Sequence, residues 1–309
     1  MSENTYRGRF APSPTGPLHF GSLVAAVGSY LQARVNNGEW FLRIENIDPP
    51  REPEGASQQI IHTLEHFGFE WDGPILYQHD RLHDYENLLN ELSKTGRLYQ
   101  CSCSRKKIAL QNKNRTGPLV YPGTCRNKTW CPGKSRFAEN FSLRLDTRNV
   151  SLNFNDAIQG IQKYGLEHQG DYVIRRADGL YSYLFAVAID DAQQGITEVV
   201  RGADLLACTA RQIYLQQLLN LPTPDYAHLP LAHDPQTGQK LSKQNGAPAI
   251  KGNVHVALLW YALKFLGQAP DKEIIESNID EIWNWAIKNW KFKFVPKTAD
   301  IEKELYKVC

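Results

Sequence analysis

The sequence predicts an α/β fold with parallel strands, a small inserted domain and a helical C-terminal segment. Three observations lead to this prediction. Strand-like and helix-like apolar patterns alternate over residues 6–96 and return over residues 172–219. Residues 100–170 hold a group of cysteines and several Gly-Pro and Pro-Gly breaks, which is typical of a small insert. From about residue 252 onward the pattern is helical and includes several tryptophans.

The N-terminal segments predict a parallel βαβ unit. Tyr6–Phe10 is short and extended, and it leads into Ala11–Pro17, whose prolines exclude a helix. A helix follows and ends at Asn36–Gly38, and Trp40–Ile44 then has the pattern of a buried strand. Because strand, loop, helix and strand follow one another, we expect the two strands to be parallel. The apolar face of the helix consists of Leu23, Val27, Tyr30 and Leu31.

The later segments predict more elements of the same kinds. Two helices come before the insert, one ended by Gly68 and the other by Gly96. After the insert, apolar runs predict three strands, and a periodic segment predicts a helix over Leu205–Leu219. The three predicted strands are Tyr172–Ile174, Tyr181–Ile189 and Ile196–Val200. The two earlier helices are indicated by Ile60, Ile61, Leu64 and Phe67, and by Tyr85, Leu88, Leu89 and Leu92.

The composition is that of an ordinary globular protein. Of the 309 residues, 42% are hydrophobic and 22% are charged, which argues against disorder. No apolar run approaches the ~20 residues that cross a bilayer, and the N-terminus lacks the regions of a signal peptide. We therefore expect a cytoplasmic protein with no membrane partner. The net charge of +2 is too small to indicate a nucleic-acid partner, so any RNA-binding face must be a local patch.

The first chemical motif, Pro17-Leu18-His19-Phe20-Gly21-Ser22, lies between the first strand and the first helix. Backbone N–H groups at a helix N-terminus favour anionic phosphate, and a glycine lets a nucleotide approach the backbone closely. His19 can donate a hydrogen bond to a phosphoryl oxygen as charge develops there. Taken alone, His19 is more readily explained as a simple helix cap.

The second motif is Lys240-Leu241-Ser242-Lys243-Gln244, in a polar loop after the second half of the predicted sheet. Lys240 and Lys243 are spaced to project onto one triphosphate, where point charges stabilise a leaving pyrophosphate. Taken alone, this segment could be an ordinary solvated loop.

Together the two motifs resemble the class I aminoacyl-tRNA synthetases, and in particular their glutamyl branch. His19–Ser22 stands where that family has its HIGH signature, and Lys240–Gln244 where it has KMSKS. Both are degenerate, as the glutamyl branch commonly allows. The resemblance implies a Rossmann-type catalytic domain with a zinc-binding insertion and a short helical C-terminal domain. It also implies that ATP binds with Mg²⁺ at His19, Gly21 and Lys243, with Lys240 and Lys243 acting on the pyrophosphate.

The same resemblance implies a site for L-glutamate. Arg9–Gly16 resembles the branch's RxAPSPTG segment, in which Arg9 takes a carboxylate of the substrate and Ala11 and Ser13 lie beside it. Arg43–Asp48 resembles its RIEDTD segment, which puts Glu45 against the substrate ammonium. Val187 is a departure, because the full-length glutamyl enzymes usually carry a polar contact there. Two further glutamate contacts are implied at Tyr183 and Arg201.

The cysteine group suggests one structural zinc ion rather than disulfides. Cys101 and Cys103 precede Cys125 by a loop-sized gap, and four such ligands would make a tetrahedral site. The fourth ligand is open. The family resemblance implies Tyr121, whereas Cys131 is the better donor on softness alone. A set of free thiols without metal is the alternative.

Only about 65 residues follow Gln244, too few for the anticodon-reading domain of a full glutamyl-tRNA synthetase. This plan resembles the glutamyl-queuosine tRNA(Asp) synthetases, which implies that glutamate passes from glutamyl-AMP to the queuosine base in the tRNA(Asp) anticodon, and a monomer by family default. A shortened conventional glutamyl-tRNA synthetase and a non-catalytic RNA-binding paralogue are the alternatives. We expect Trp283, Trp285 and Trp290 to pack the C-terminal helices. The expected lobes are residues 1–99 and 171–235 (catalytic), 100–170 (insert) and 236–309 (lysine loop and helices).

Overall fold

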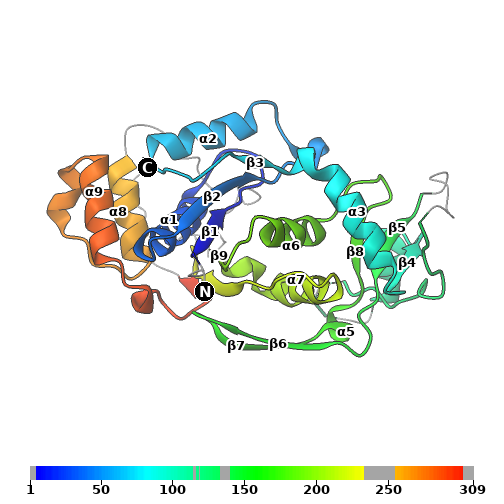
Figure 1. Cartoon of the computed structure of the whole chain (residues 1–309). Coiled ribbons are helices and arrows are strands. Elements are labelled where there is room, and N and C mark those ends of the chain that lie inside the picture. The colour runs from blue at the N-terminus through cyan, green and yellow to red at the C-terminus, as the bar shows by residue number, and fades with distance from the viewer. Residues whose placement is uncertain (1–4, 114–115, 118, 133–139, 233–254, 302–309) are drawn as a thin grey trace.

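A parallel sheet in two halves forms the centre of the fold (Figure 1). In the first half β1 pairs with β2 and β2 with β3. In the second half β9 pairs with β10, also in parallel. The computed structural model describes residues 5–113, 116–117, 119–132, 140–232 and 255–301. The strands are β1 (Arg7–Phe10), β2 (Glu39–Ile44), β3 (Leu76–Tyr77), β9 (Glu198–Gly202) and β10 (Asp225–Leu229).

The two halves of the sheet meet at β1 and β9. The Thr197 N–H, just before β9, donates to the Arg7 carbonyl at 2.9 Å. The spatial order is therefore β3, β2, β1, β9, β10, and the chain changes direction of travel across the sheet between β1 and β9. In open α/β sheets, ligands bind outside the carboxyl ends of the strands at such a switch point. We therefore expect the ligand-binding site at the carboxyl ends of β1 and β9.

The helix α1 (Phe20–Val35) confirms the predicted βαβ unit. Its buried face includes the four predicted apolar side chains, and it ends at the cap residue Asn36. Gly38 is needed directly after it, because a Cβ there would lie 2.5 Å from the Tyr6 carbonyl oxygen. The two helices predicted before the insert are confirmed as α2 (Ala56–His66) and α3 (Leu82–Ser93).

The strand predicted over Tyr181–Ile189 is wrong. The segment forms helix α6 (Tyr183–Gln193), with Ser182 as its N-cap accepting from the Phe185 N–H. All residues from Phe185 to Asp191 are buried, so the helix is surrounded by protein on every side. A helix buried all round has no apolar stripe of period 3.6, and its continuous apolar run cannot be told from a buried strand. The other elements predicted in this region are confirmed as β8 (Tyr172–Arg175), β9 and α7 (Leu206–Leu218).

The inserted segment contributes to two sheets. One is an antiparallel sheet in the order β4-β5-β8. The other contribution is a hairpin of β6 and β7, and β6 pairs in parallel with β10 of the catalytic sheet. One hairpin of the segment 100–170 therefore extends the catalytic sheet. The elements of this segment are β4 (Leu98–Cys101), α4 (Arg105–Gln111), β5 (Ser142–Leu145), β6 (Ser151–Asp156), β7 (Gly160–Gly165) and α5 (Leu166–Gln169).

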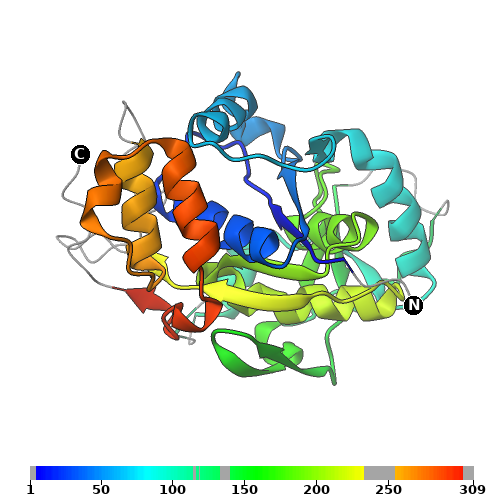
Figure 2. The same ribbon diagram turned by 60° about the vertical axis from the view of Figure 1, so that its left-hand side comes forward.

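The C-terminal helices α8 (His255–Phe265) and α9 (Ile279–Asn289) pack beside α1, as Figure 2 shows. Trp283 Nε1 donates to the Phe67 carbonyl at 2.8 Å, and Trp290 Nε1 donates to Gln32 at 3.1 Å. Both tryptophans are buried, and Trp285 is half-buried against the same core, so their predicted packing role is confirmed. No helix of the described ranges is long and apolar enough to span a bilayer.

The remaining elements are short. Strand β11 (Leu231–Ala232) pairs in parallel with β12 (Asp300–Ile301) and ties the end of the described chain to the end of the catalytic sheet. The 3-10 turns are η1 (Pro49–Arg51), η2 (Gln78–Arg81), η3 (Ala203–Leu205), η5 (Lys272–Glu276) and η6 (Phe292–Phe294).

Candidate active site and cysteine cluster

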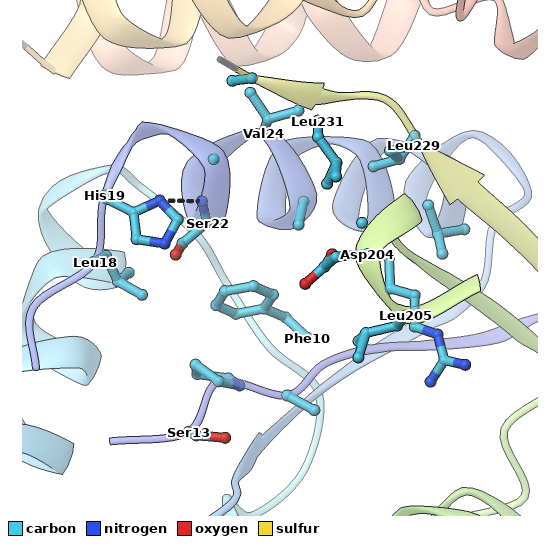
Figure 3. Close-up of a pocket in the computed structure, with 18 of the residues that line it drawn as sticks. Phe10, Ser13, Leu18, His19, Ser22, Val24, Asp204, Leu205, Leu229 and Leu231 are labelled. Atoms are coloured by element: carbon cyan, nitrogen blue, oxygen red, sulfur yellow. Dashed lines mark hydrogen bonds between the residues drawn. The ribbon is translucent and has the colours of Figure 1, made fainter. Parts of the chain in front are cut away.

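A cavity of about 330 Å³ lies at the switch point between β1 and β9. Its walls come from the carboxyl ends of three parallel strands, β1, β9 and β10, and from the first turn of α1. Figure 3 shows Phe10, Leu18, Leu229 and Asp204 among the residues around this space. The predicted residues that line it are Arg9, Ala11, Ser13, His19, Gly21, Glu45, Tyr183 and Arg201. One cavity therefore collects side chains that are far apart in the sequence.

His19 is the N-cap of α1 and lies on the cavity wall. Its Nδ1 accepts from the Ser22 N–H at 3.2 Å, drawn as the dashed line in Figure 3. Because an accepting Nδ1 carries no proton, a neutral His19 bears its proton on Nε2 and can donate from there. The capping role and a phosphate-binding role thus use different nitrogens of one ring. Gly21, in the same first turn, leaves the helix N-terminus accessible to an anion.

Arg9 and Glu45 belong to a buried ion-pair cluster. Arg9 Nε donates to Asp191 at 3.0 Å, and Arg43 Nη2 donates to Asp191 at 2.8 Å and to Glu45 at 3.4 Å. Burial would raise the pKa of Asp191, but the two arginines outweigh it and lower this pKa to about 2. For Glu45 burial prevails over the same arginines and raises the pKa to about 7. Glu45 is thus a buried carboxylate whose charge a bound ammonium group would stabilise.

Arg201 is held by three side chains and keeps one donor for the cavity. Its Nε donates to His228 Nε2 at 3.1 Å, and its Nη2 donates to Thr209 at 2.8 Å and to Gln212 at 2.7 Å. Arg201 Nη1 is buried and has no hydrogen-bond partner among the described residues. A buried, unsatisfied donor of a cation is costly, which favours an anionic ligand at this point.

His228 is itself fixed by Asp156, at the end of β6. Its Nδ1 lies 2.5 Å from the Asp156 carboxylate, and both side chains are fully buried. Burial and the nearby Arg201 lower the pKa of His228 to about 4, although Asp156 opposes them. The imidazole is therefore neutral at pH 7, with Nδ1–H donated to Asp156 and Nε2 accepting from Arg201. Asp156 on the insert hairpin thus fixes His228, and His228 in turn fixes Arg201 at the cavity.

Tyr183 and Val187 both lie in the first half of α6, but only Tyr183 lines the cavity. Tyr183 lines the cavity, and burial raises its pKa, so its hydroxyl is protonated and able to donate. Val187, one turn later, is fully buried and is not among the residues that line the cavity. Lys240 and Lys243 lie outside the described residues.

The cysteine cluster is formed by Cys101 at the end of β4, Cys103 and Cys125. Their three Sγ atoms lie within 4.8 Å of one another. Tyr121 Oη lies 3.8 Å from Cys103 Sγ and accepts from the Cys125 N–H at 2.9 Å. The fold thus brings together three thiols and one phenol, whereas Cys131 is exposed and outside this group. Three sulfur donors and one oxygen donor at these separations fit a tetrahedral zinc ion.

Sequence reasoning missed the residues that orient the cavity. Asp191 contacts Arg9 from 182 positions away, His228 contacts Arg201 from 27 positions away, and Asp156 holds His228 from 72 positions away. The order of the residues carries little signal for such contacts. One signal in the sequence was His228, which directly precedes Leu229-Pro230 at the end of a parallel strand. Strand ends meet at the ligand-binding edge of such a sheet, so a polar side chain there indicates a site residue.

Comparison with known proteins gives the family. Residues 5–256 match tRNA synthetases class I (E and Q), catalytic domain. A glutamyl-Q tRNA(Asp) synthetase of Dechloromonas aromatica (strain RCB) is 51% identical over 95% of this chain and 97% of its own length. Another, from Pseudomonas aeruginosa, is 44% identical over 97% of this chain and 99% of its own.

The crystal structure of a glutamate-tRNA synthetase from Elizabethkingia anophelis matches with a TM-score of 0.79 and 26% identity, covering 97% of this chain and 69% of that one. The predicted Rossmann-type class I synthetase fold is thereby confirmed. The chain belongs to the class I tRNA synthetases (E and Q) and, within them, to the glutamyl-Q tRNA(Asp) synthetases.

Proposed function

We propose that this chain activates L-glutamate with ATP and transfers it to the queuosine base in the anticodon of tRNA(Asp). The names and 43–51% identity of its relatives support this reaction and acceptor. The observation that carries glutamate binding is the cavity itself, where two buried arginines face one buried carboxylate beside a helix N-terminus. Such a site complements a ligand with two carboxylates and one ammonium group.

In this proposal the glutamate contacts are divided by charge. Arg9 and Arg201 take the carboxylates, and the unpartnered Nη1 of Arg201 is the donor that a substrate oxygen satisfies. Glu45 takes the ammonium group, and Tyr183 donates from its phenol. Ala11 and Ser13 form the wall beside Arg9. A neutral analogue would leave these charged groups unpaired, so the site would reject it.

The activation step needs positioned charge and no nucleophilic side chain. An oxygen of the α-carboxylate attacks the α-phosphorus of ATP, the bond to the bridging oxygen breaks, and pyrophosphate leaves with that electron pair. His19 Nε2–H and the α1 N-terminus at Gly21 bind the phosphates, and Lys240 and Lys243 stabilise the leaving pyrophosphate. Mg²⁺ accompanies ATP. A hydroxyl of the queuosine base then displaces AMP to give the ester.

We assign Cys101, Cys103, Tyr121 and Cys125 as ligands of one structural zinc ion. Zinc would cross-link the insert through four side chains of two segments. Metal analysis of purified variants tests this set. Tyr121→Phe is expected to lower bound zinc and Cys131→Ser to leave it at one per chain; zinc lost only from Cys131→Ser protein would contradict the assignment.

The remaining assignments follow the family. ATP, L-glutamate and queuosine-containing tRNA(Asp) are the proposed partners, and no membrane partner is proposed. The proposed location is the cytoplasm, and the proposed oligomeric state is a monomer. The proposed lobes keep the ranges 1–99, 100–170, 171–235 and 236–309.

A two-stage experiment tests the function. Glutamate-dependent ATP–pyrophosphate exchange without tRNA is expected, and its absence would indicate a non-catalytic paralogue. Labelled glutamate is then offered with tRNA(Asp) with and without queuosine, and label is expected only with queuosine. Labelling of a tRNA 3′ end independent of queuosine would favour a conventional glutamyl-tRNA synthetase and contradict the proposed acceptor.

A further inference from the structure

A second cavity, of about 280 Å³, lies where the insert meets α7. We call it the insert pocket. It is separate from the glutamate cavity and shares no lining residue with it. In Figure 1 the elements around it, α5, α7, β5 and β8, lie toward the end of the molecule away from α8 and α9. The lining residues that matter are Arg105, Tyr121, Arg144, Gln169, Tyr172 and Arg211.

The insert pocket has an excess of positive charge. Among the described residues, none of Arg105, Arg144 and Arg211 has a carboxylate within 4.0 Å. The one acidic residue on its wall is Asp171, whose carboxylate is already paired with Arg126 at 2.6 and 3.0 Å. Burial lowers the pKa of Arg211, as expected for a cation without a counterion.

Two arginine donors at the insert pocket are buried and unsatisfied. Arg144 Nη1 donates to the Asp171 carbonyl at 2.9 Å, and Arg211 Nη2 donates to the Gln169 carbonyl at 2.8 Å. Arg144 also lies over the Tyr121 ring, and Arg211 over the Tyr172 ring, so both guanidinium groups are fixed in place. Their Nε atoms have no hydrogen-bond partner in the described part of the chain, although Arg144 also interacts with the Cys101 thiol. Unpaired buried donors of this kind are costly without an anionic ligand.

An unsatisfied acceptor completes the set. Gln169 Oε1 is buried and accepts no hydrogen bond from any described residue. The insert pocket therefore offers cationic donors for an oxyanion and one acceptor for a hydroxyl, beside the apolar side chains of Ile108 and Leu119. A phosphate attached to a sugar supplies both groups, whereas a carboxylate alone supplies no hydroxyl donor.

We propose that the insert pocket binds one backbone phosphate of the RNA that accepts glutamate, with a neighbouring 2′-hydroxyl donating to Gln169. This inference rests on the proposed function for the presence of an RNA substrate. Arginine forks suit a phosphate oxygen pair, and the cavity is of a size for one phosphate and its sugar rather than for a larger ligand. Arg105 on the wall of the pocket is exposed, and the two lysines that follow it in the sequence are exposed as well. Arg144 rests on the ring of Tyr121, so a phosphate held there would lie next to the cysteine cluster.

The main test compares Arg211→Gln with Lys163→Gln, which removes an equal charge from the exposed face of β7 outside the pocket. The probe is queuosine-containing tRNA(Asp), and its Kd is measured over a series of salt concentrations. Arg211→Gln is expected to weaken binding about tenfold. It should also reduce the slope of log K against log salt by roughly 0.7 to 0.9, the value of one lost phosphate contact. Lys163→Gln should change neither.

Two checks separate binding from damage to the fold. Arg211 shares α7 with Thr209 and Gln212, which hold Arg201, so the KM for glutamate in tRNA-free exchange is measured in the same protein. It is expected within about twofold of the wild type. Gln169→Glu, on α5, puts a carboxylate beside the proposed phosphate and should weaken tRNA binding several-fold. Because Gln169 Nε2 also donates to the Ala207 carbonyl on α7 at 3.4 Å, the KM for glutamate is measured in this variant too. The reduced salt slope is a readout that a purely structural defect would not give.

Two results would overturn the inference. One is an unchanged Kd and salt slope in Arg211→Gln protein. The other is stabilisation of the wild type but not of Arg211→Gln by inorganic phosphate at constant ionic strength, with equal tRNA affinity of both, which would identify a site for a free anion. Failure of the proposed function gives a different result. The wild type would then show no glutamate-dependent exchange or no transfer, whereas Arg211→Gln would still bind tRNA more weakly than the wild type.

Discussion

At the scale of single residues, the arginines of the glutamate cavity are prepared in two different ways. Arg9 is neutralised within the protein by Asp191, whereas Arg201 is held by neutral partners and keeps a buried donor without a partner among the described residues. Among the described residues Arg201 has no carboxylate partner, so a substrate carboxylate would be its first counterion. Arg9 already has Asp191, so a substrate carboxylate would be its second. The electrostatic gain on binding should be larger at Arg201.

Replacing Arg201 should thus mainly affect glutamate affinity. Arg201→Gln removes a charge-assisted contact of about 1.5 to 3 kcal/mol, so the KM for glutamate in exchange is expected to rise about 10- to 100-fold. The KM for ATP should change far less. Arg148→Gln, an exposed arginine paired with Asp146, is the matched control and should leave both values unchanged. Equal increases of both KM values would argue against a specific glutamate contact.

His228 predicts a pH dependence of stability. Its pKa is lowered to about 4 in the folded protein, from an ordinary value near 6.5. As pH falls from 6.5 to 4, the unfolded chain binds this proton first, so the free energy of unfolding decreases through that window, by up to about 3 kcal/mol. In His228→Gln protein, denaturation between pH 7 and 4 should show a shallower decrease, while the exposed His62→Gln should keep the wild-type slope. Identical slopes in all three proteins would contradict this role.

At the scale of elements, the sequence patterns were informative for helices that keep polar residues between their apolar ones. The helices α1, α2, α3 and α7 follow their apolar stripes, and the strands β1, β2, β8 and β9 lie where short apolar runs predicted them. The exception is α6, which is buried all round and therefore lacks a stripe. The site residues came from motif segments next to these elements. Their partners did not, because Asp191 and His228 act through tertiary contacts that no local pattern encodes.

The N-cap of α6 gives a prediction at this scale. Ser182 accepts from the Phe185 N–H, and Tyr183 is the first helical residue and lines the glutamate cavity. Ser182→Ala should cost about 1 kcal/mol of unfolding free energy and raise the KM for glutamate, because fraying displaces Tyr183. Ser104→Ala removes the equivalent cap of α4 and should leave that KM unchanged, since α4 lies in the insert. An unaltered KM in Ser182→Ala protein would mean that packing alone fixes Tyr183.

At the scale of the whole molecule, one buried carboxylate on α6, which follows the insert in sequence, joins this helix to two neighbouring strands that precede the insert. Asp191 on α6 accepts from Arg9 on β1 at 3.0 Å and from Arg43 on β2 at 2.8 Å, and all three side chains are buried. Segments on the two sides of the insert are thus connected by these ion pairs as well as by the β1–β9 contact. Removing Asp191 would leave Arg9 buried without a described counterion and Arg43 with Glu45 alone.

Asp191→Asn should therefore destabilise the protein by about 3 to 5 kcal/mol, because two arginines lose their shared anion. Since the pKa of Asp191 is lowered to about 2, its contribution is present above pH 4 and is lost only as pH falls from about 4 to 2. Urea denaturation at pH 7 measures the difference. The control is Asp178→Asn, which breaks an exposed pair with Arg176 and should cost less than about 1 kcal/mol. A similar small cost for both variants would mean that the halves of the sheet are joined by packing, with the ion pairs serving only to position Arg9 for its substrate.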